Sequence, residues 1–461
     1  MGGSDKFNLD LLTQLRPRGW EVTIATTLGG EQSWAAQFAR YTPDIFLLDR
    51  FLRSADYPRF LRALIHSRDA DAVLISHSEF GYQLLPYLRA HFPSLPLLDF
   101  CHIEEEGWKN GGYPHMSATY QDMLDRQLVT SHHLKGWMEK RGADPASIDV
   151  CYINVDADYW RPDPDRGRRA RRRFDIAETT PLIVFAGRVC PQKQPAVLAQ
   201  TAARLAQRSS DFLLLVAGDG PDFEWLRTFV KKNRLDRQVR LLGAVPNAEI
   251  RDLLAAADIF FLPSEWEGIA LSIYEAMACG VPVVGADVGG QAELVTPECG
   301  VLIGRGEEAG EARQYADILA QLLSDPERRK TLGHHARRRI EDHFRLEHMT
   351  ERFLAAYDAA RQERETAARP VPGIGLGRAC ASQAVEYQRL SSLTGWLWQE
   401  RGQAAAGGLV PAHAHSWRTG LYFALRRALL PAYSALLKRN QSWLLPLKNR
   451  LKRRLLREGS P

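Results

Sequence analysis

The strongest constraint on the fold is a regular alternation of short apolar runs with longer amphipathic stretches, which continues from Glu21 to about Thr366. Almost every interval between two apolar runs is long enough for a helix. Strands that alternate with helices in this way indicate βαβ units, in which helices cover both faces of a parallel sheet. The runs that we interpret as strands form two series of six: 21–26, 44–48, 72–76, 95–100, 127–130 and 149–153, then 182–186, 212–217, 239–241, 259–262, 281–284 and 300–303. We therefore predict an α/β chain with two doubly wound, Rossmann-like domains.

Turn-forming residues concentrate between the two series, at 154–167, where Asp and Pro residues mark a connection. We place the domain boundary there, with an N-terminal domain at 1–160 and a C-terminal domain at 161–345. A crossover helix is predicted at 346–369, and residues 370–461 are predicted to form a linker and an extension.

The amino terminus leads directly into a helical pattern. Gly2 and Gly3 are followed by apolar residues at helical spacing, among them Phe7, Leu11 and Leu15. A Gly-Gly loop that opens a helix normally follows a strand in doubly wound domains. We therefore expect that a first N-terminal strand is missing ahead of Met1.

The composition is that of a globular protein with a substantial core, at 45% apolar and 25% charged residues. These values exclude a disordered or fibrous chain. The longest apolar runs, such as 212–217 and 259–263, are far shorter than the roughly 18 residues that a membrane-spanning helix needs. The six cysteines show no C-x-x-C spacing, which indicates buried or incidental thiols in a reducing compartment.

The charge is divided unevenly along the chain. Residues 370–461 contain 14 Lys or Arg and 3 Asp or Glu, whereas residues 1–369 contain 46 and 52. Within the extension, 370–377 is interpreted as a linker and 379–399 as one helix, while 418–457 combines 11 basic residues with aromatic residues and contains no acidic residue. The last segment is typical of an amphipathic helix on an anionic membrane surface. A solvated basic extension is the alternative, and nucleic acid is not a predicted partner because no recognition module accompanies the charge.

The residues that carry chemistry lie between 185 and 295. Arg188 and Lys193 follow a predicted strand, and a guanidinium beside an ammonium suits a diphosphate. The loop 268–272 precedes a predicted helix, so its free backbone amides can bind the same anion. Glu267 and Glu275 lie on either side of that loop, and carboxylates accept hydrogen bonds from the hydroxyls of ribose or hexose. The sequence therefore predicts a nucleotide-sugar site at the carboxyl ends of these strands.

The combined pattern resembles the retaining GT-B glycosyltransferases of the group 1, glycogen-synthase-like, family 4 type. Their signature is a Glu, seven residues, and then Glu-Ala-Met-Ala-Cys-Gly-x-Pro-Val-Val, which here extends from Glu267 to Val284. The stretch Gly268-Ile269-Ala270 departs from the family's frequent Gly-Phe-Gly. The resemblance covers about residues 2–366 and implies two Rossmann-like domains that face each other across a cleft, the N-terminal one on the acceptor side and the C-terminal one binding the nucleotide sugar.

The resemblance also implies a role for each matching residue. Arg188 and Lys193 would hold the donor diphosphate, Glu275 the ribose, and Glu267 the transferred sugar, while His102 would contact the sugar near the reaction centre. The predicted catalytic residues are His102, Glu267, Arg188 and Lys193. The predicted donor-binding residues are Gly2, Gly3, Gly187, Arg188, Lys193, Gly218, Asp219, Val245, Gly268, Ile269, Ala270, Leu271 and Glu275.

The implied reaction is transfer of a sugar from a nucleoside-diphosphate sugar to an acceptor hydroxyl, with retention at the anomeric carbon and without a metal or cofactor. We expect a glycan or lipid-linked acceptor in surface glycan synthesis, and a cytoplasmic enzyme at the inner face of the membrane. The pairs Asp69/Asp71 and Asp156/Asp158 match the acidic pairs of metal-dependent transferases, but they are interpreted as turn residues. The alternative functions are a nonhydrolysing nucleotide-sugar epimerase and a catalytically silent sugar-nucleotide-binding or scaffold subunit.

Overall fold

The computed structural model describes residues 3–30, 32–209, 211–366 and 370–406. Each of the twelve predicted runs overlaps a strand, with shifts of up to three residues at the ends. The strands are β1 Ile24–Thr26, β2 Ile45–Leu47, β3 Val73–Ser76, β4 Leu97–Cys101, β5 Arg126–Val129, β6 Ile148–Val150, β7 Leu182–Ala186, β8 Leu213–Ala217, β9 Val239–Gly243, β10 Ile259–Leu262, β11 Val283–Ala286 and β12 Gly300–Ile303. The predicted α/β fold with parallel sheets is confirmed.

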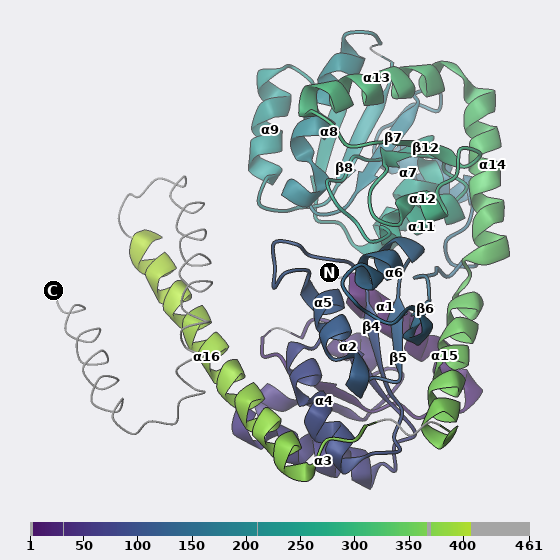
Figure 1. Cartoon of the computed structure of the whole chain (residues 1–461). Helices are drawn as coiled ribbons and strands as arrows, with labels where there is room; N and C mark the ends of the chain where they lie inside the picture. Colours follow the sequence, from purple (N-terminus) through teal and green to yellow (C-terminus); the bar gives the residue numbers. More distant parts are fainter. Residues whose placement is uncertain (1–2, 31, 210, 367–369, 407–461) are drawn as a thin grey trace. The chain divides into compact units, whose positions relative to one another are not determined.

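The C-terminal sheet contains six parallel strands in the order β12-β11-β10-β7-β8-β9. All residues of β7, β8, β10 and β11 are buried, because helices cover both faces of the sheet. Helix α8 (Pro195–Ala206) packs against α9 (Phe223–Lys232) and α13 (Glu308–Ser324), and α10 (Asn247–Ala256) packs against α7 (Pro164–Arg173) and α11 (Leu271–Ala278). Figure 1 shows several of these helices around β7 and β8.

The connectivity of this sheet creates a switch point between β7 and β10. From β7 the chain continues outward through β8 and β9, and it then returns to the other side of β7 to form β10. Both neighbours of β7 are parallel to it, with Ile183 opposite Leu214 of β8 and Ile259 of β10. Loops at the carboxyl ends of such strands diverge on either side of the switch point, where open α/β sheets bind ligands.

The N-terminal strands form two separate sheets in the part of the chain that the structure describes. Strands β3-β4-β5-β6 form a parallel sheet in sequence order, and β1 pairs only with β2. The first series of six runs is therefore not one continuous sheet. Strands β1 and β2 have three half-buried residues each. The additional strand expected ahead of Met1 stays a prediction.

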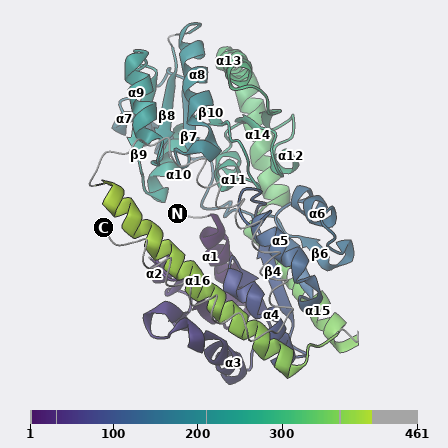
Figure 2. The same cartoon turned by 60° about the vertical axis from the view of Figure 1, so that its left-hand side comes forward.

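The other helices surround these strands or connect the two parts of the chain. They are α1 Gly3–Leu15, α2 Ala35–Phe38, α3 Tyr57–Ser67, α4 Glu79–His91, α5 Gly112–Thr119, α6 His132–Glu139, α12 Gln291–Leu294, α14 Pro326–His343, α15 Leu346–Thr366 and α16 Ile374–Ala406. Helix α15 packs on α1, β4 and β5 (Figure 2). Its Arg364 shares the buried carboxylate of Asp125 with Arg89, which anchors α15 to the N-terminal sheet.

Helix α16 is longer than predicted. Residues 374–377 were expected in a linker, but α16 begins at Ile374. A Cβ at Gly377 would lie only 3.0 Å from Pro86 O and the Ala90 Cβ, so glycine allows the first turns to pack closely on α4.

Residues 3–388 belong to one compact unit, and a second begins at Arg389. Within the described part of the chain, no helix carries an apolar stretch of the length needed to cross a bilayer. The segment 418–457 lies outside the described residues.

Candidate functional site

The predicted diphosphate-binding residues lie at the switch point of the C-terminal sheet. Arg188 and Lys193 are in the loop after β7, and Glu267 is in the loop after β10. Because β7 and β10 are adjacent and parallel, their following loops meet although Lys193 and Glu267 are 74 residues apart in sequence. The sheet thus brings together three of the four predicted catalytic residues.

Lys193 and Glu267 form an ion pair that is largely shielded from solvent, with side chains 13% and 8% exposed. The same two loops are joined through Gln192. The side-chain amide of Gln192 donates to Trp266 O at 3.1 Å, and the backbone carbonyl of Gln192 accepts from Glu265 N at 2.8 Å. The ammonium is therefore held at a fixed place beside a carboxylate.

Arg188 has a different environment from Lys193. Its side chain is exposed, and its guanidinium donates to Gln192 Oε1 at 3.4 Å. The guanidinium can turn toward an incoming anion at little cost, since no carboxylate of the described residues holds it. One fixed ammonium and one accessible guanidinium make this edge of the sheet suitable for a diphosphate.

Gly218 and Asp219 shape the neighbouring loop after β8. Gly218 has a φ of +153°, and a Cβ there would collide with the carbonyl oxygen of Gly187, so the two loops pack backbone on backbone. Asp219 O accepts from Val189 N at 3.0 Å, while the Asp219 side chain is exposed. These residues form the support of the site. Val245, after β9, is partly buried against the core two strands away from β7.

The loop after β10 enters α11, which carries Glu275. The side chains of Ile269 and Ala270 are buried, and α11 begins at Leu271 without a side-chain cap. Glu275 is 8% exposed, and burial raises the pKa of its carboxyl to about 8. Lys6 of α1 lowers that pKa and Asp10 raises it, which places the first turns of α1 near Glu275. Gly3 opens α1, and Gly2 lies outside the described residues.

His102 directly follows β4, at the carboxyl ends of the strands of the N-terminal sheet. The imidazole is buried, and neither ring nitrogen has a hydrogen-bond partner among the described residues. It packs on Phe7 and Phe100, with ring centroids 5.1 and 4.8 Å away. Burial lowers the pKa of His102 well below its usual range, so the ring is uncharged at neutral pH. A Cβ at Gly268 would collide with His102 O, so the loop after β10 approaches this histidine.

Two residues of this region were not assigned a role by sequence reasoning. Glu293 of α12 accepts hydrogen bonds at 2.8 Å from His132 N and His133 N, at the start of α6, and from the Tyr152 hydroxyl. It thereby joins the C-terminal part of the chain to the N-terminal one. His77 follows β3 as His102 follows β4, and this shared position after a strand is the signal that would have found it.

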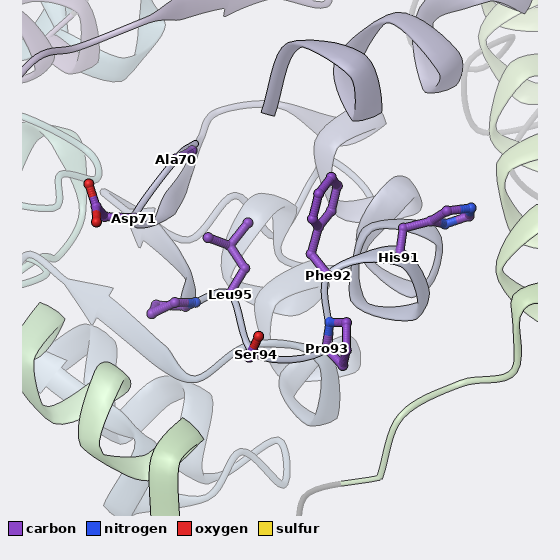
Figure 3. Close-up of a pocket in the computed structure, with 8 residues that line it drawn as sticks. Ala70, Asp71, His91, Phe92, Pro93, Ser94 and Leu95 are labelled. Carbon is purple, nitrogen blue, oxygen red and sulfur yellow. The ribbon is translucent and has the colours of Figure 1, made fainter. Parts of the chain in front are cut away.

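The pocket drawn in Figure 3 lies elsewhere in the N-terminal part. It has a volume of about 350 Å³ and is lined by residues 70–71 and 91–96, among them Asp71 and His91. None of the predicted site residues lines it.

Among the residues that the structure describes, no group of three or more His, Cys, Asp or Glu is arranged to hold a metal ion. A reaction without metal or cofactor stays a prediction.

Comparisons with known proteins identify the family. Residues 168–339 match the family described as glycosyl transferases group 1, and residues 1–159 match glycosyltransferase family 4. A GDP-mannose-dependent monoacylated alpha-(1-6)-phosphatidylinositol monomannoside mannosyltransferase of Corynebacterium glutamicum is 31% identical over 264 residues, which are 55% of this chain and 67% of that protein. This chain belongs to the group 1 glycosyltransferases of family 4. The predicted resemblance is thus confirmed at the level of the family.

Other relatives of this glycosyltransferase agree with that assignment. The D-inositol 3-phosphate glycosyltransferase of Nocardia farcinica is 32% identical over 269 residues, 56% of this chain and 57% of that protein. The chain thus spans about half to two thirds of the length of these curated relatives. The crystal structure of Anabaena HepE in complex with UDP has a TM-score of 0.66 at 18% identity, covering 78% of this chain and 96% of that chain. Sucrose-phosphate synthase from Thermosynechococcus elongatus has a TM-score of 0.61 at 19% identity, covering 77% and 93%. These likenesses confirm the GT-B fold with two Rossmann-like domains.

Proposed function

We propose that this glycosyltransferase transfers a hexosyl group from a nucleoside-diphosphate sugar to an acceptor hydroxyl with retention of configuration, and that it needs no metal or cofactor. The observation that carries the proposal is the pair of cations, Arg188 and Lys193, at the switch point of the C-terminal sheet. The names of two similar proteins support it: one is GDP-mannose-dependent, and HepE was crystallised with UDP-glucose.

The ion pair between Lys193 and Glu267 is expected to rearrange when the donor binds. A diphosphate brings two negative charges to the ammonium, and Glu267 then turns to the hydroxyls of the sugar. The acceptor oxygen forms a bond to the anomeric carbon on the face from which the phosphate departs. The leaving phosphate oxygen takes the proton of the acceptor hydroxyl. Arg188 and Lys193 stabilise the charge that develops on the diphosphate.

His102 and Glu275 are proposed to orient the donor. His102 is uncharged and its ring nitrogens have no partner among the described residues, so the imidazole can donate a hydrogen bond to, or accept one from, a hydroxyl of the transferred sugar. Glu275 is proposed to accept hydrogen bonds from the ribose hydroxyls. Gly187, Gly218, Asp219 and Val245 are proposed to line the nucleotide, and the amides of 268–271 to bind phosphate oxygens.

The acceptor is proposed to be a glycan or a lipid-linked saccharide, used in surface glycan synthesis on the cytoplasmic face of a membrane. Two observations support this. The curated mannosyltransferase relative is named for a phosphatidylinositol mannoside, and 418–457 carries 11 basic residues without an acid. Nucleic acid is not a proposed partner.

The test is to titrate the protein calorimetrically with UDP and GDP and then to supply the matching nucleotide sugars in the presence of EDTA. We expect one nucleotide to bind and its sugar to be hydrolysed slowly without acceptor, with the α-anomer released first from an α-linked donor, as NMR would show. Binding without turnover would favour the silent scaffold. Conversion of the donor to an epimer would favour the epimerase, and no nucleotide binding would contradict the proposal altogether.

A further inference from the structure

Two histidines lie side by side at the carboxyl edge of the N-terminal sheet. Strands β3 and β4 pair in parallel, with Ser76 opposite Phe100. His77 directly follows β3, and His102 directly follows β4. Their ring centroids are 4.7 Å apart, with an interplanar angle of 88°. A group bound at His77 therefore lies next to the residue proposed to face the transferred sugar.

The backbone of His77 is held in an uncommon conformation. Its φ is +48°, in the left-handed region that non-glycine residues rarely adopt. The following Ser78 fixes this turn, because its hydroxyl accepts from Gly81 N at 2.9 Å and lies 2.6 Å from Thr27 Oγ1. Such conformations persist where the surroundings determine them, and they cluster at ligand sites.

Aromatic rings pack beside His77 in the N-terminal part of the chain. Tyr113 of α5 stacks on the imidazole with centroids 4.7 Å apart and planes at 17°. Trp108 meets Tyr113 edge-on at 5.0 Å, and the Lys109 ammonium lies over the indole at 4.9 Å while it pairs with Glu79. These rings are half-buried. Apolar ring faces with a few polar groups at their edges are typical of small-molecule sites.

We propose that His77 binds the acceptor and positions its reacting hydroxyl beside His102, and that the acceptor presents an uncharged ring polyol, a sugar or cyclitol, to Tyr113 and Trp108. This inference rests on the function proposed above. A neutral imidazole offers one donor and one acceptor, which match the two hydrogen-bonding roles of a hydroxyl. Burial lowers the pKa of His77 to about 4, so at neutral pH the ring carries no charge that would attract a phosphate.

Two substitutions separate the role of the ring from that of the backbone. H77G removes the imidazole, and glycine adopts a positive φ without strain. H77N keeps one donor and one acceptor, and asparagine tolerates the left-handed region. H66N, at an exposed histidine on α3, is the control. The probes are UDP or GDP, whichever binds, its nucleotide sugar, and two acceptors, methyl α-D-mannopyranoside and mannose 6-phosphate.

We expect H77G to raise the acceptor KM for methyl α-D-mannopyranoside at least tenfold, with the nucleotide Kd within twofold of wild type. H77N should have an acceptor KM between those of H77G and wild type, and H66N should behave as wild type. An unchanged acceptor KM in H77G overturns the inference, as does an equal loss of nucleotide affinity. A wild-type enzyme that hydrolyses the donor without acceleration by the mannoside, or that prefers mannose 6-phosphate, also overturns it. If the wild type binds no nucleotide, the proposed function fails instead.

Discussion

Arg188 and Lys193 share a proposed role but differ in what each does for the folded protein. Arg188 is exposed and makes one long hydrogen bond to Gln192, so its removal should change only the binding of the leaving diphosphate. We expect R188A to lower kcat/KM by about 10- to 100-fold or more, because each charge-assisted hydrogen bond contributes about 1.5–3 kcal/mol. Its unfolding free energy should stay within about 0.5 kcal/mol of wild type. Initial rates and urea denaturation measure the two effects.

Lys193 provides the matched comparison. K193A should lose activity and also stability, by about 3 kcal/mol, because it leaves the shielded carboxylate of Glu267 without its partner. The double variant K193A/E267A should recover stability but not turnover. Wild-type rates in R188A or K193A would contradict the proposed diphosphate site.

The carboxyl of Glu275 predicts a pH dependence of stability. Burial raises its pKa to about 8, whereas a glutamate in an unfolded chain titrates near 4.3. Between these values the folded protein keeps a proton that the unfolded chain releases, so this group lowers the unfolding free energy as pH rises from about 4.5 to 8, by at most about 1.4 kcal/mol per unit. We expect the stability gained by E275Q over wild type to grow from pH 5 to 8 and to level off above 8. Urea denaturation across this range measures the difference, with exposed Glu178→Gln as the control. A difference that does not change with pH would contradict the shift.

The residues of the candidate site were predictable to different extents. Arg188, Lys193 and Glu267 were singled out because cations and carboxylates after predicted strands meet at one edge of a parallel sheet. The ion pair between Lys193 and Glu267 was not predicted, because strand order within the sheet decides which loops touch. The stacking of His77 on Tyr113 likewise depends on how the loop after β4 folds back, which no local pattern encodes.

At the scale of elements, the contact between α12 and α6 is a specific prediction of this structure. Glu293 accepts two backbone N–H groups at the start of α6 and the hydroxyl of Tyr152, while Ser131 caps the same helix. Helix starts carry unsatisfied donors and favour negative charge. We expect E293A to lower the unfolding free energy by about 2–4 kcal/mol, and Y152F by about 1 kcal/mol.

A double-mutant cycle tests whether these effects come from the same contact. The losses in E293A and Y152F should not add, because both variants remove the hydrogen bond between the two side chains. Equilibrium unfolding monitored by far-UV circular dichroism gives the four free energies. Simple additivity would show that the hydrogen bond between Glu293 and Tyr152 contributes nothing to stability. A neutral E293A would show that Glu293 does not hold α12 against α6.

Strands were easier to predict than the limits of α16. An apolar run flanked by turn residues marks a strand locally, and all twelve runs overlap one. The start of α16 was misplaced because Pro-Gly-rich sequence normally marks a linker. Gly377 is helical here because its close packing on α4 compensates for the low helix propensity of glycine. Tertiary contacts of this kind do not appear in a local pattern.

For the molecule as a whole, the division of charge has the clearest consequence. Residues 1–369 contain six more acidic than basic residues, and residues 370–461 contain eleven more basic than acidic ones. An anionic surface should therefore repel residues 1–369 and attract residues 370–461. A truncation that tests this must keep α16, because Ala381 and Ala384 are buried with the core cluster around Tyr87 and Leu88.

We expect the full chain to co-sediment with vesicles of phosphatidylcholine and phosphatidylglycerol, and a 1–406 variant to remain in the supernatant. Each Lys or Arg near an anionic surface contributes about 1 kcal/mol, and 418–457 supplies eleven of them. About 0.5 M NaCl should weaken the binding of the full chain, because exposed charges are screened at that ionic strength. Both proteins should bind the nucleotide equally, since the switch-point residues lie within 1–406. Equal sedimentation of the two proteins would show that 418–457 adds no membrane affinity, and it would remove the support for a membrane-bound acceptor.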